Sequence, residues 1–367
     1  MNITYLFGAG ASYNAIPVVG ELEKAFEQFH EWAEIQLGPL VDSNSNSSID
    51  RGYKLFLEQL NQCAYRSRVF GTIDTYAKTL ALNENTHDLS MLKSTLSLFF
   101  TLWQELQLKN TAIEKVRTKN SKNEKYLLND KGFQDIDSRY ITLLTNYLQI
   151  NREKTDKKPV ILNTNVKFLT WNYDTQLERA LALISGNNLN DVLENYSIHP
   201  TNQISSEEIP DIVHLNGIAG YYETENSKVS LFKEANPEGG LNFKNLLKEK
   251  LYFIDSTEKR TVNTNNFLHF AWENNNVAKK GRDYAIKILE KTDVLIVVGY
   301  SFPDFNLEVD IELFNALKIN GREDFKIIYQ DLNANQEIIT RNFGIDPSKI
   351  EIENKNLNKF ILPLERR

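Results

Sequence analysis

The chain has 367 residues, of which 41% are hydrophobic and 25% are charged, a composition typical of globular proteins with a sizeable core. Its formal net charge of −7 argues against nucleic acid bound over the whole surface. The single cysteine, Cys63, excludes an internal disulfide framework and a cysteine-rich zinc site. The sequence shows neither a secretory signal nor an apolar run long enough to cross a bilayer, so we expect a soluble, cytoplasmic protein.

The chain opens with a short β-prone run, Ile3–Phe7, followed at once by the glycine-rich segment Gly8–Ser12. Residues Glu21–Leu37 then carry an apolar stripe at steps of three or four residues, which predicts an amphipathic helix. The stripe consists of Leu22, Phe26, Phe29, Ala33 and Leu37. A strand, a glycine turn and a helix in this order are typical of the first unit of a doubly wound nucleotide-binding sheet.

The pattern is then helical for a long stretch. Its clearest apolar stripe recurs at alternating steps of four and three residues: Leu92, Leu96, Phe99, Trp103 and Leu106. We therefore expect a helical module over residues 40–159, inserted into an α/β domain formed by residues 1–39 and 160–367. Within that domain, residues 221–285 read as a second insertion of mixed, mostly helical character.

Strand-like runs return after the helical module. Further strands are predicted at Val166–Trp171, Asp211–Leu215, Asp293–Gly299 and Phe325–Tyr329, and helices at Asp174–Leu183 and Leu307–Leu317. The unbroken apolar run of the 293–299 segment is typical of a central parallel strand covered on both faces. Strands alternating with helices at both ends of the chain predict a Rossmann-like, doubly wound, mostly parallel sheet with helices on each face.

Four polar or glycine-containing segments each follow a predicted strand. They are Gly8–Ser12, Thr170–Asp174, Val213–Gly217 and Gly299–Asp304. In an open α/β sheet ligands bind outside the carboxyl ends of the strands, so these segments are the candidate site. Each also has a purely structural interpretation as a tight turn, a helix cap or a hydrogen-bonded structural histidine.

The residue types in these segments suit a dinucleotide. The glycines allow the backbone to approach a pyrophosphate, although Tyr13 stands where the dehydrogenase fingerprint has a third small residue. His214 and Asn216 are two residues apart on a predicted strand, so they share one face. After the last predicted strand, Asp331 and Asn333 lie where an acidic or amide side chain often contacts an adenosine ribose.

Taken together, the segments GAGAS, TWNYD, HLNG and GYSFPD, in this order and each after a strand, resemble the SIR2 (sirtuin-like) family. More narrowly they resemble bacterial SIR2-domain proteins of anti-phage defence, whose activity is hydrolysis of NAD⁺. The resemblance covers about a third of the chain and leaves residues 40–160 and 221–285 unmatched.

The resemblance implies a role for each matched residue. The pyrophosphate would be bound by Gly8, Ala9, Gly10, Ala11 and Ser12, with Pro17 closing the cofactor loop. Asn172 and Asp174 would contact the nicotinamide ribose and the nucleophile. Gly299 and Ser301 would contact the adenosine half, with Asp331 or Asn333 near its ribose.

The chain departs from the family at two positions. Sirtuins usually carry glutamine where this chain has Trp171, and their catalytic histidine stands immediately before the glycine, where this chain has Asn216. His214 lies on the same face of the strand, about 6–7 Å away by strand rise, so either residue is open for that role. Protein-deacetylating sirtuins also hold a four-cysteine zinc module, which a chain with one cysteine cannot form.

The expected function is therefore hydrolysis of the nicotinamide–ribose bond of NAD⁺ in abortive-infection defence. The expected catalytic residues are Asn172, Asp174 and His214. Asn216 would contact the cofactor, and no metal is expected. His214 would act as the base, since an ordinary histidine titrates near physiological pH. The resemblance also implies a homo-oligomer or a partner such as a HerA-type ATPase or another phage sensor. Two alternatives stay open: a subunit that binds NAD⁺ or ADP-ribose without cleaving it, and an ADP-ribosyltransferase.

Overall fold

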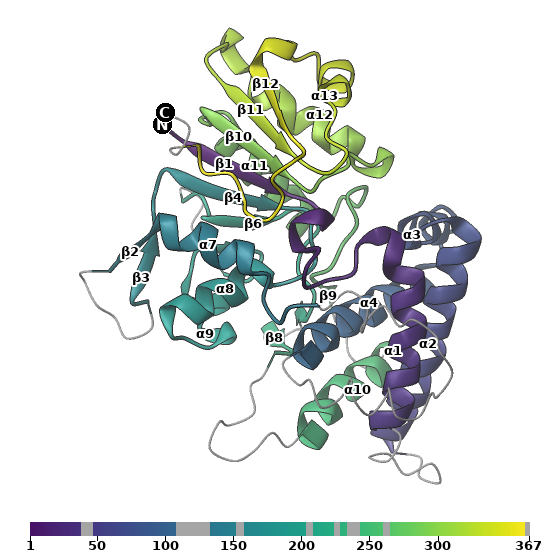
Figure 1. Ribbon diagram of the computed structural model, residues 1–367. Coiled ribbons are helices and arrows are strands. Elements are labelled where there is room, and N and C mark those ends of the chain that lie inside the picture. Colours follow the sequence, from purple (N-terminus) through teal and green to yellow (C-terminus); the bar gives the residue numbers. More distant parts are fainter. Residues whose placement is uncertain are drawn as a thin grey trace. The chain divides into compact units, whose positions relative to one another are not determined.

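The computed structural model describes residues 1–37, 47–107, 133–151, 158–202, 208–223, 228–232, 243–259 and 265–363 (Figure 1). Its contacts divide the chain into two compact units. The sheet unit comprises residues 1–13, 136–218 and 269–367, and the helical unit comprises residues 14–135 and 219–268.

These boundaries differ from those expected from the sequence. Helix α1 (Leu22–Leu37) belongs to the helical unit rather than to the α/β domain, and helix α7 (Ser138–Tyr147) belongs to the sheet unit rather than to the helical insert. The expected insertion at 221–285 is also divided, because residues 219–268 join the helical unit and the chain then returns to the sheet unit. An apolar stripe predicts that a helix is buried, but it does not say which partner buries it.

The sheet unit is built on a seven-stranded parallel sheet in the order β12-β11-β10-β1-β4-β6-β5. Its strands are β1 (Ile3–Phe7), β4 (Val166–Thr170), β5 (Ile198–His199), β6 (Ile212–His214), β10 (Val294–Val298), β11 (Lys326–Gln330) and β12 (Ile350–Glu353). The predicted α/β class and parallel sheet are confirmed, and β5 and β12 were not predicted. A separate antiparallel pair joins β2 (Leu148–Ile150) to β3 (Val160–Leu162).

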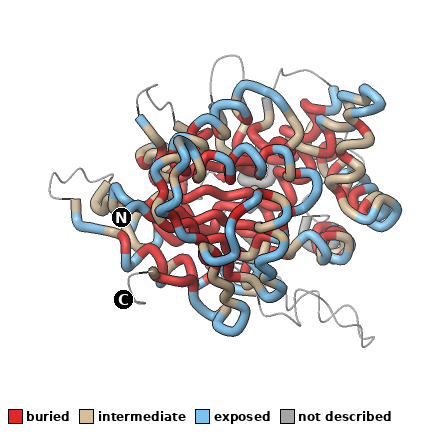
Figure 2. Tube along the Cα trace, turned by 90° about the horizontal axis from the view of Figure 1, so that it is seen from above, coloured by how far each residue is buried: buried red, intermediate tan, exposed pale blue. Residues whose placement is uncertain are grey.

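Side chains of β1 alternate between two apolar layers. Leu6 belongs to a core that also contains residues of helices α11 and α12, whereas Tyr5 and Phe7 lie on the opposite face. There the ring of Phe7 packs edge-on against Tyr140 of α7, with 5.2 Å between ring centroids. Every residue of β1 and β10 is buried, and Figure 2 shows the central strands in red. Cover on both faces explains why these strands read as continuous apolar runs.

Helices of the sheet unit connect successive strands. Besides α7, they are α8 (Gln176–Ser185), α9 (Leu189–Asn195), α11 (Asn276–Leu289), α12 (Leu307–Ala316) and α13 (Gln336–Phe343). Short 3₁₀ turns lie at Ala9–Ser12 (η1), Asp304–Asn306 (η4), Ile319–Gly321 (η5) and Pro347–Lys349 (η6). The predicted helices after β4 and β10 are confirmed as α8 and α12.

In the helical unit α1 packs against α2 (Ser48–Phe70). Helix α2 in turn packs with α3 (Ile73–Leu82), α4 (Thr86–Gln107) and α10 (Phe243–Lys259). Its core is aromatic: the Phe26 ring lies 4.7 Å from that of Phe99, and Phe29 contacts both Phe56 and Trp103. The 3₁₀ turn η2 (Val19–Glu21) precedes α1. A small antiparallel sheet in the order β8-β7-β9 completes the unit, with strands Lys228–Ser230, Tyr221–Glu223 and Asn265–Asn266.

Candidate active site

The candidate site lies at the carboxyl edge of the sheet, where β1 is flanked by β4 on one side and β10 on the other. The early strands β4, β5 and β6 lie on one side of β1 and the late strands β10, β11 and β12 on the other, so the strand order reverses between β1 and β10. Ligands of open parallel sheets bind at such a switch point. Gly8 and Gly299 directly follow β1 and β10, so both begin loops at this place.

The loops after β1 and β10 pack backbone against backbone. The N–H of Gly8 donates to the carbonyl of Val298 at 2.9 Å, and the N–H of Gly10 donates to the carbonyl of Gly299 at 2.8 Å. A Cβ atom on Gly299 would lie 2.3 Å from the nitrogen of Ala11, and the φ angle of Gly299 is +58°. Glycine is therefore required at position 299 both by the close approach of the loops and by the backbone conformation.

This packing gives the glycine-rich segment a use other than the expected pyrophosphate cradle. The N–H groups of Gly8 and Gly10 are engaged as described, and that of Ala11 donates to the carbonyl of Gly8 at 2.9 Å. Residues Ala9–Ser12 of this segment form the 3₁₀ turn η1, and α1 begins only at Leu22, so no α-helix starts directly at the glycine turn. In this arrangement the glycines serve the contact between the loops.

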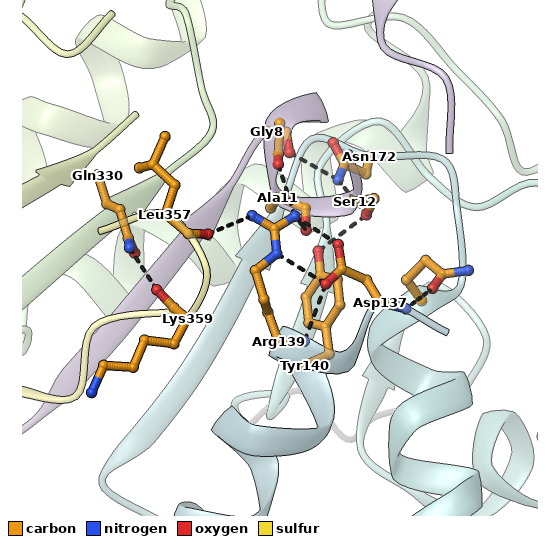
Figure 3. Close-up of polar contacts among 12 residues, drawn as sticks. Gly8, Ala11, Ser12, Asp137, Arg139, Tyr140, Asn172, Gln330, Leu357 and Lys359 are labelled. Carbon is orange, nitrogen blue, oxygen red and sulfur yellow. Dashed lines mark hydrogen bonds and ion pairs between the residues drawn. The ribbon is translucent and has the colours of Figure 1, made fainter. Parts of the chain in front are cut away.

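Arg139 holds the glycine-rich segment from the other side (Figure 3). Its Nη2 donates to the carbonyls of Gly10 and Ala11 at 3.2 and 3.1 Å, and its Nη1 donates to the carbonyl of Leu357 at 3.3 Å. Its Nε and Nη2 also donate to the carboxylate of Asp137, at 2.9 and 2.6 Å. Both side chains are almost completely buried, so this is a fully desolvated bidentate pair.

Asn172 joins the end of β4 to the same segment (Figure 3). Its Nδ2 donates to the carbonyl of Gly8 at 3.0 Å and to the Ser12 hydroxyl at 3.2 Å. The Ser12 hydroxyl also lies 3.1 Å from that of Tyr140, while the N–H of Asn172 donates to Thr170 Oγ1 at 3.0 Å. Among the described residues no donor reaches the side-chain oxygen of Asn172, so that oxygen is able to accept a hydrogen bond from water or a ligand hydroxyl.

Asp174 lies just before α8 and is buried. Its Oδ1 accepts the N–H of Gln176 at 2.9 Å, which satisfies one of the unpaired donors at the start of the helix. Burial raises the pKa of the Asp174 carboxyl to about 6, although the hydrogen bonds from Gln176 and Ser12 oppose the rise. A carboxyl group with such a pKa exchanges its proton near neutral pH.

His214, at the end of β6, faces two acceptors. Its Nε2 lies 2.7 Å from Glu178 Oε1, and its Nδ1 lies 3.3 Å from the main-chain carbonyl oxygen of Asn172. Burial disfavours the charged ring, but the neighbouring Glu178 carboxylate outweighs burial and raises the pKa of His214 above its ordinary value. The sequence hypothesis made His214 a base, yet in this structure neither ring nitrogen is free to take a proton from a substrate.

Asn216 lies two residues after His214, beyond the end of β6, and Val213 and Leu215 belong to the apolar core. The Asn216 Nδ2 donates to the carbonyl of Trp171 at 3.2 Å. Its Oδ1 is buried and has no hydrogen-bond partner among the described residues. Both strand-end amides, Asn172 and Asn216, therefore hold main-chain carbonyls of neighbouring loops.

The remaining predicted residues lie at various places. Ser301 is exposed in the loop after β10. Asp331 and Asn333 form one turn after β11, in which the Asp331 carboxylate accepts the N–H of Asn333 at 2.8 Å. Pro17 belongs to the helical unit. The structure thus brings the loops after β1, β4, β6 and β10 together through hydrogen bonds, and places Asp331 one strand farther along the same edge.

Two charged residues at the site were not predicted from the sequence. Glu178 lies one helical turn after Asp174, so the shared face of the predicted helix is a signal that could have found it. Arg139 is far from the glycine-rich segment in the chain and lies in a stretch without a motif, so no local pattern indicates it. Long-range partners of this kind become visible only in the folded chain.

A buried acid lies behind the loop that follows β10. The Tyr300 hydroxyl donates to Asp310 Oδ2 at 2.7 Å and accepts a hydrogen bond from Asn306 Nδ2 at 2.9 Å. The Tyr300 ring also stacks on Trp171, with 6.0 Å between centroids. Burial raises the pKa of Asp310 to about 8, against the lowering effect of the Tyr300 hydrogen bond. The fold therefore favours the protonated form of this carboxyl.

Asp310 should make the stability of the sheet unit depend on pH. Its folded-state pKa of about 8 lies above the value of about 3.9 expected in the unfolded chain, so the fold should lose stability as pH rises from about 4 to 8. Asp310 accounts for a decrease in the free energy of unfolding of about 1.4 kcal/mol per pH unit at most. We expect the difference in melting temperature, Asp310→Asn minus wild type, to increase from pH 5 to pH 8. The exposed Asp304→Asn variant is the control, and a difference that does not change with pH would contradict the prediction.

The described part of the chain contains no cluster of three or more His, Cys, Asp or Glu side chains arranged to hold a metal ion. Among its helices none has the length and apolar character needed to cross a bilayer. Comparison with protein-family models, with curated proteins and with solved structures finds no significant match to this chain. The functional argument therefore rests on the residues at the sheet edge.

Proposed function

We propose that the sheet unit is a sirtuin-like domain that hydrolyses the nicotinamide–ribose bond of NAD⁺, releasing nicotinamide and ADP-ribose. The observation that carries the proposal is the contact of Asn172 with the glycine-rich segment, since its Nδ2 lies 3.0 Å from the Gly8 carbonyl oxygen at the switch point of the sheet. This contact joins two of the four sirtuin-like motifs where a dinucleotide is expected to bind.

The chemistry makes few demands on the protein. Nicotinamide leaves as a neutral group, and the ribose develops positive charge as its glycosidic bond breaks. The side-chain oxygen of Asn172 would orient the attacking water or a ribose hydroxyl, since it can accept a hydrogen bond. Asp174 would stabilise the positive ribose and take the proton of the water, because its pKa of about 6 suits proton transfer near neutral pH.

An enzyme that depletes NAD⁺ is toxic to its cell. The proposed activity fits abortive-infection defence in the cytoplasm, with turnover released by assembly or by a partner such as a HerA-type ATPase or another phage sensor. Of the residues assigned to the site, all but Pro17 belong to the sheet unit, so the helical unit is the candidate assembly surface.

A second candidate is a subunit that binds NAD⁺ or ADP-ribose without cleaving it. The observation that favours it is the engagement of both His214 nitrogens, at 2.7 Å from Glu178 and 3.3 Å from the Asn172 carbonyl. In such a subunit the sheet edge would hold the dinucleotide, and no residue would accept a proton during a reaction.

Nicotinamide release distinguishes these functions. Purified protein, alone and with lysate of phage-infected cells, is incubated with NAD⁺ carrying label in its adenosine half, and nicotinamide, ADP-ribose and labelled macromolecules are measured. We expect nicotinamide and ADP-ribose in equal amounts, and a fall of at least about 100-fold for Asn172→Ala and Asp174→Asn. Asn146→Ala, an exposed amide on α7, is the matched control.

Three other results would redirect the interpretation. Binding of NAD⁺ without nicotinamide release would identify a binding subunit. Label that appears on protein or nucleic acid would identify an ADP-ribosyltransferase. If the protein neither binds NAD⁺ nor releases nicotinamide under any of these conditions, the proposal is contradicted.

A further inference from the structure

The ion pair between Glu178 and His214 is the most deeply buried pair of charged side chains at the site. The side chains of Glu178 and His214 are 0% and 1% exposed, and Glu178 Oε1 lies 2.7 Å from His214 Nε2. Glu178 Oε2 is also buried and has no hydrogen-bond partner among the described residues. An unpaired carboxylate in such surroundings is costly, so the contact with His214 is the one that compensates its charge.

The second nitrogen of the ring also faces an acceptor. His214 Nδ1 lies 3.3 Å from the carbonyl oxygen of Asn172, and a carbonyl can only accept a hydrogen bond. A hydrogen on Nδ1 is needed for this contact to be a hydrogen bond, and a hydrogen on Nε2 is needed for the ring to donate to the Glu178 carboxylate. An imidazole ring with hydrogens on both nitrogens is the imidazolium cation.

Two other titratable groups influence the ring. The Asp174 carboxyl favours a positive charge on His214, whereas His199, on the adjacent strand β5, disfavours it only when His199 is itself charged. Burial lowers the pKa of His199 to about 3, so that ring is neutral. Its Nε2 lies 3.0 Å from the carbonyl oxygen of Val277. The charges that face His214 are thus negative.

We propose that Glu178 is a positioning residue which, together with the Asn172 carbonyl, keeps His214 as an imidazolium that holds the turn between β4 and α8. The imidazolium is bonded to the turn at Asn172 and to the first helical turn at Glu178, so it fixes the spacing between Asn172 and Asp174. The expected effect of Glu178 on the rate of turnover rests on the proposed NAD⁺ hydrolysis. The expected protonation state of His214 is independent of that proposal.

Nitrogen NMR of the full-length, histidine-labelled protein tests the protonation state directly. Single replacement of each of the five histidines assigns the signals. We expect His214 to show two protonated nitrogens at pH 7 and to lose its proton only above the ordinary histidine value of about 6.5. In Glu178→Gln the pKa of His214 should fall below that value, while the exposed Glu194→Gln control should leave it unchanged. A neutral His214 in the wild type at pH 7 would overturn the proposal, even if Glu178→Gln fails to fold.

Kinetics separate this inference from the proposed function. If the wild type releases nicotinamide, Glu178→Gln should lower kcat with little change in KM, and Glu178→Asp, which keeps the charge, should restore part of the loss. A lower kcat with an unchanged pKa of His214 would overturn the positioning role and leave the hydrolase proposal standing. The protein could also show an imidazolium that depends on Glu178 and yet release no nicotinamide. That result would support the inference about His214 and contradict the hydrolase proposal.

Discussion

Replacing Gly299 with alanine should destabilise the sheet unit by about 2–5 kcal/mol and abolish the dinucleotide binding proposed for its carboxyl edge. Part of the cost, about 1–2 kcal/mol, comes from forcing an L side chain into a left-handed backbone conformation, since the φ angle of Gly299 is +58°. The rest comes from overlap, because the new Cβ would lie 2.3 Å from the Ala11 nitrogen and 2.4 Å from the Gly10 carbonyl carbon. Neither atom belongs to a side chain that can rotate away, so the two loops must separate.

Gly344→Ala is the matched control for this substitution. Gly344 has nearly the same φ angle, +61°, but no atom lies within 4 Å of the position of its Cβ. Urea denaturation of the two variants therefore isolates the contact between the loops, which we expect to contribute about 1–3 kcal/mol. Equal destabilisation of both variants would show that the loops do not pack as described. Titration with NAD⁺ should show binding to Gly344→Ala and none to Gly299→Ala.

Arg139→Ala should cost about 3–5 kcal/mol, the range observed when one partner of a buried ion pair is removed. The substitution leaves the Asp137 carboxylate buried without its compensating charge, since that side chain is 0% exposed. It also leaves the carbonyls of Gly10, Ala11 and Leu357 without the donor that Arg139 provides. Because two of these carbonyls belong to the glycine-rich segment, we expect weaker NAD⁺ binding together with the lower stability.

Two further variants show whether this loss comes from burial of the pair. Arg68→Ala removes an arginine that also contacts two glutamates, but its side chain is 58% exposed, so we expect a much smaller loss of stability than for Arg139→Ala. The double variant Arg139→Met with Asp137→Asn removes both buried charges and should recover part of the stability that Arg139→Ala loses. An effect of Arg139→Ala no larger than that of Arg68→Ala would contradict the role assigned to Arg139.

The sheet was predictable because its strands are short apolar runs that end in distinctive residues. Five of the seven strands were expected within one residue of their observed bounds, including the central β10 (Val294–Val298). The strand β5 consists of Ile198 and His199 alone, and β12 carries Glu351 and Glu353, so neither shows a run that stands out from its surroundings. Short and half-polar edge strands are the ones that pattern alone misses.

The site was only partly predictable, and the reason is distance along the chain. Asn172, Asp174 and His214 each follow or end a strand, which is a local signal that the sequence carries. The use that the fold makes of them depends on partners from other segments: Asn172 contacts the loop of Gly8, and His214 contacts the helix of Glu178. A sequence read without its fold identifies the residues at the sheet edge but cannot say which of their atoms are already engaged.

The central position of β1 has a consequence for how the protein is made. Ile3 pairs with Val166 on one side and with Val294 on the other, so β1 must wait until Val294 has been synthesised before both neighbours exist. Contacts between such distant segments form slowly, and an unpaired apolar strand invites aggregation in the meantime. We expect nascent β1 to depend on chaperones, whereas helices α1, α2, α3 and α4 can assemble as soon as they are synthesised.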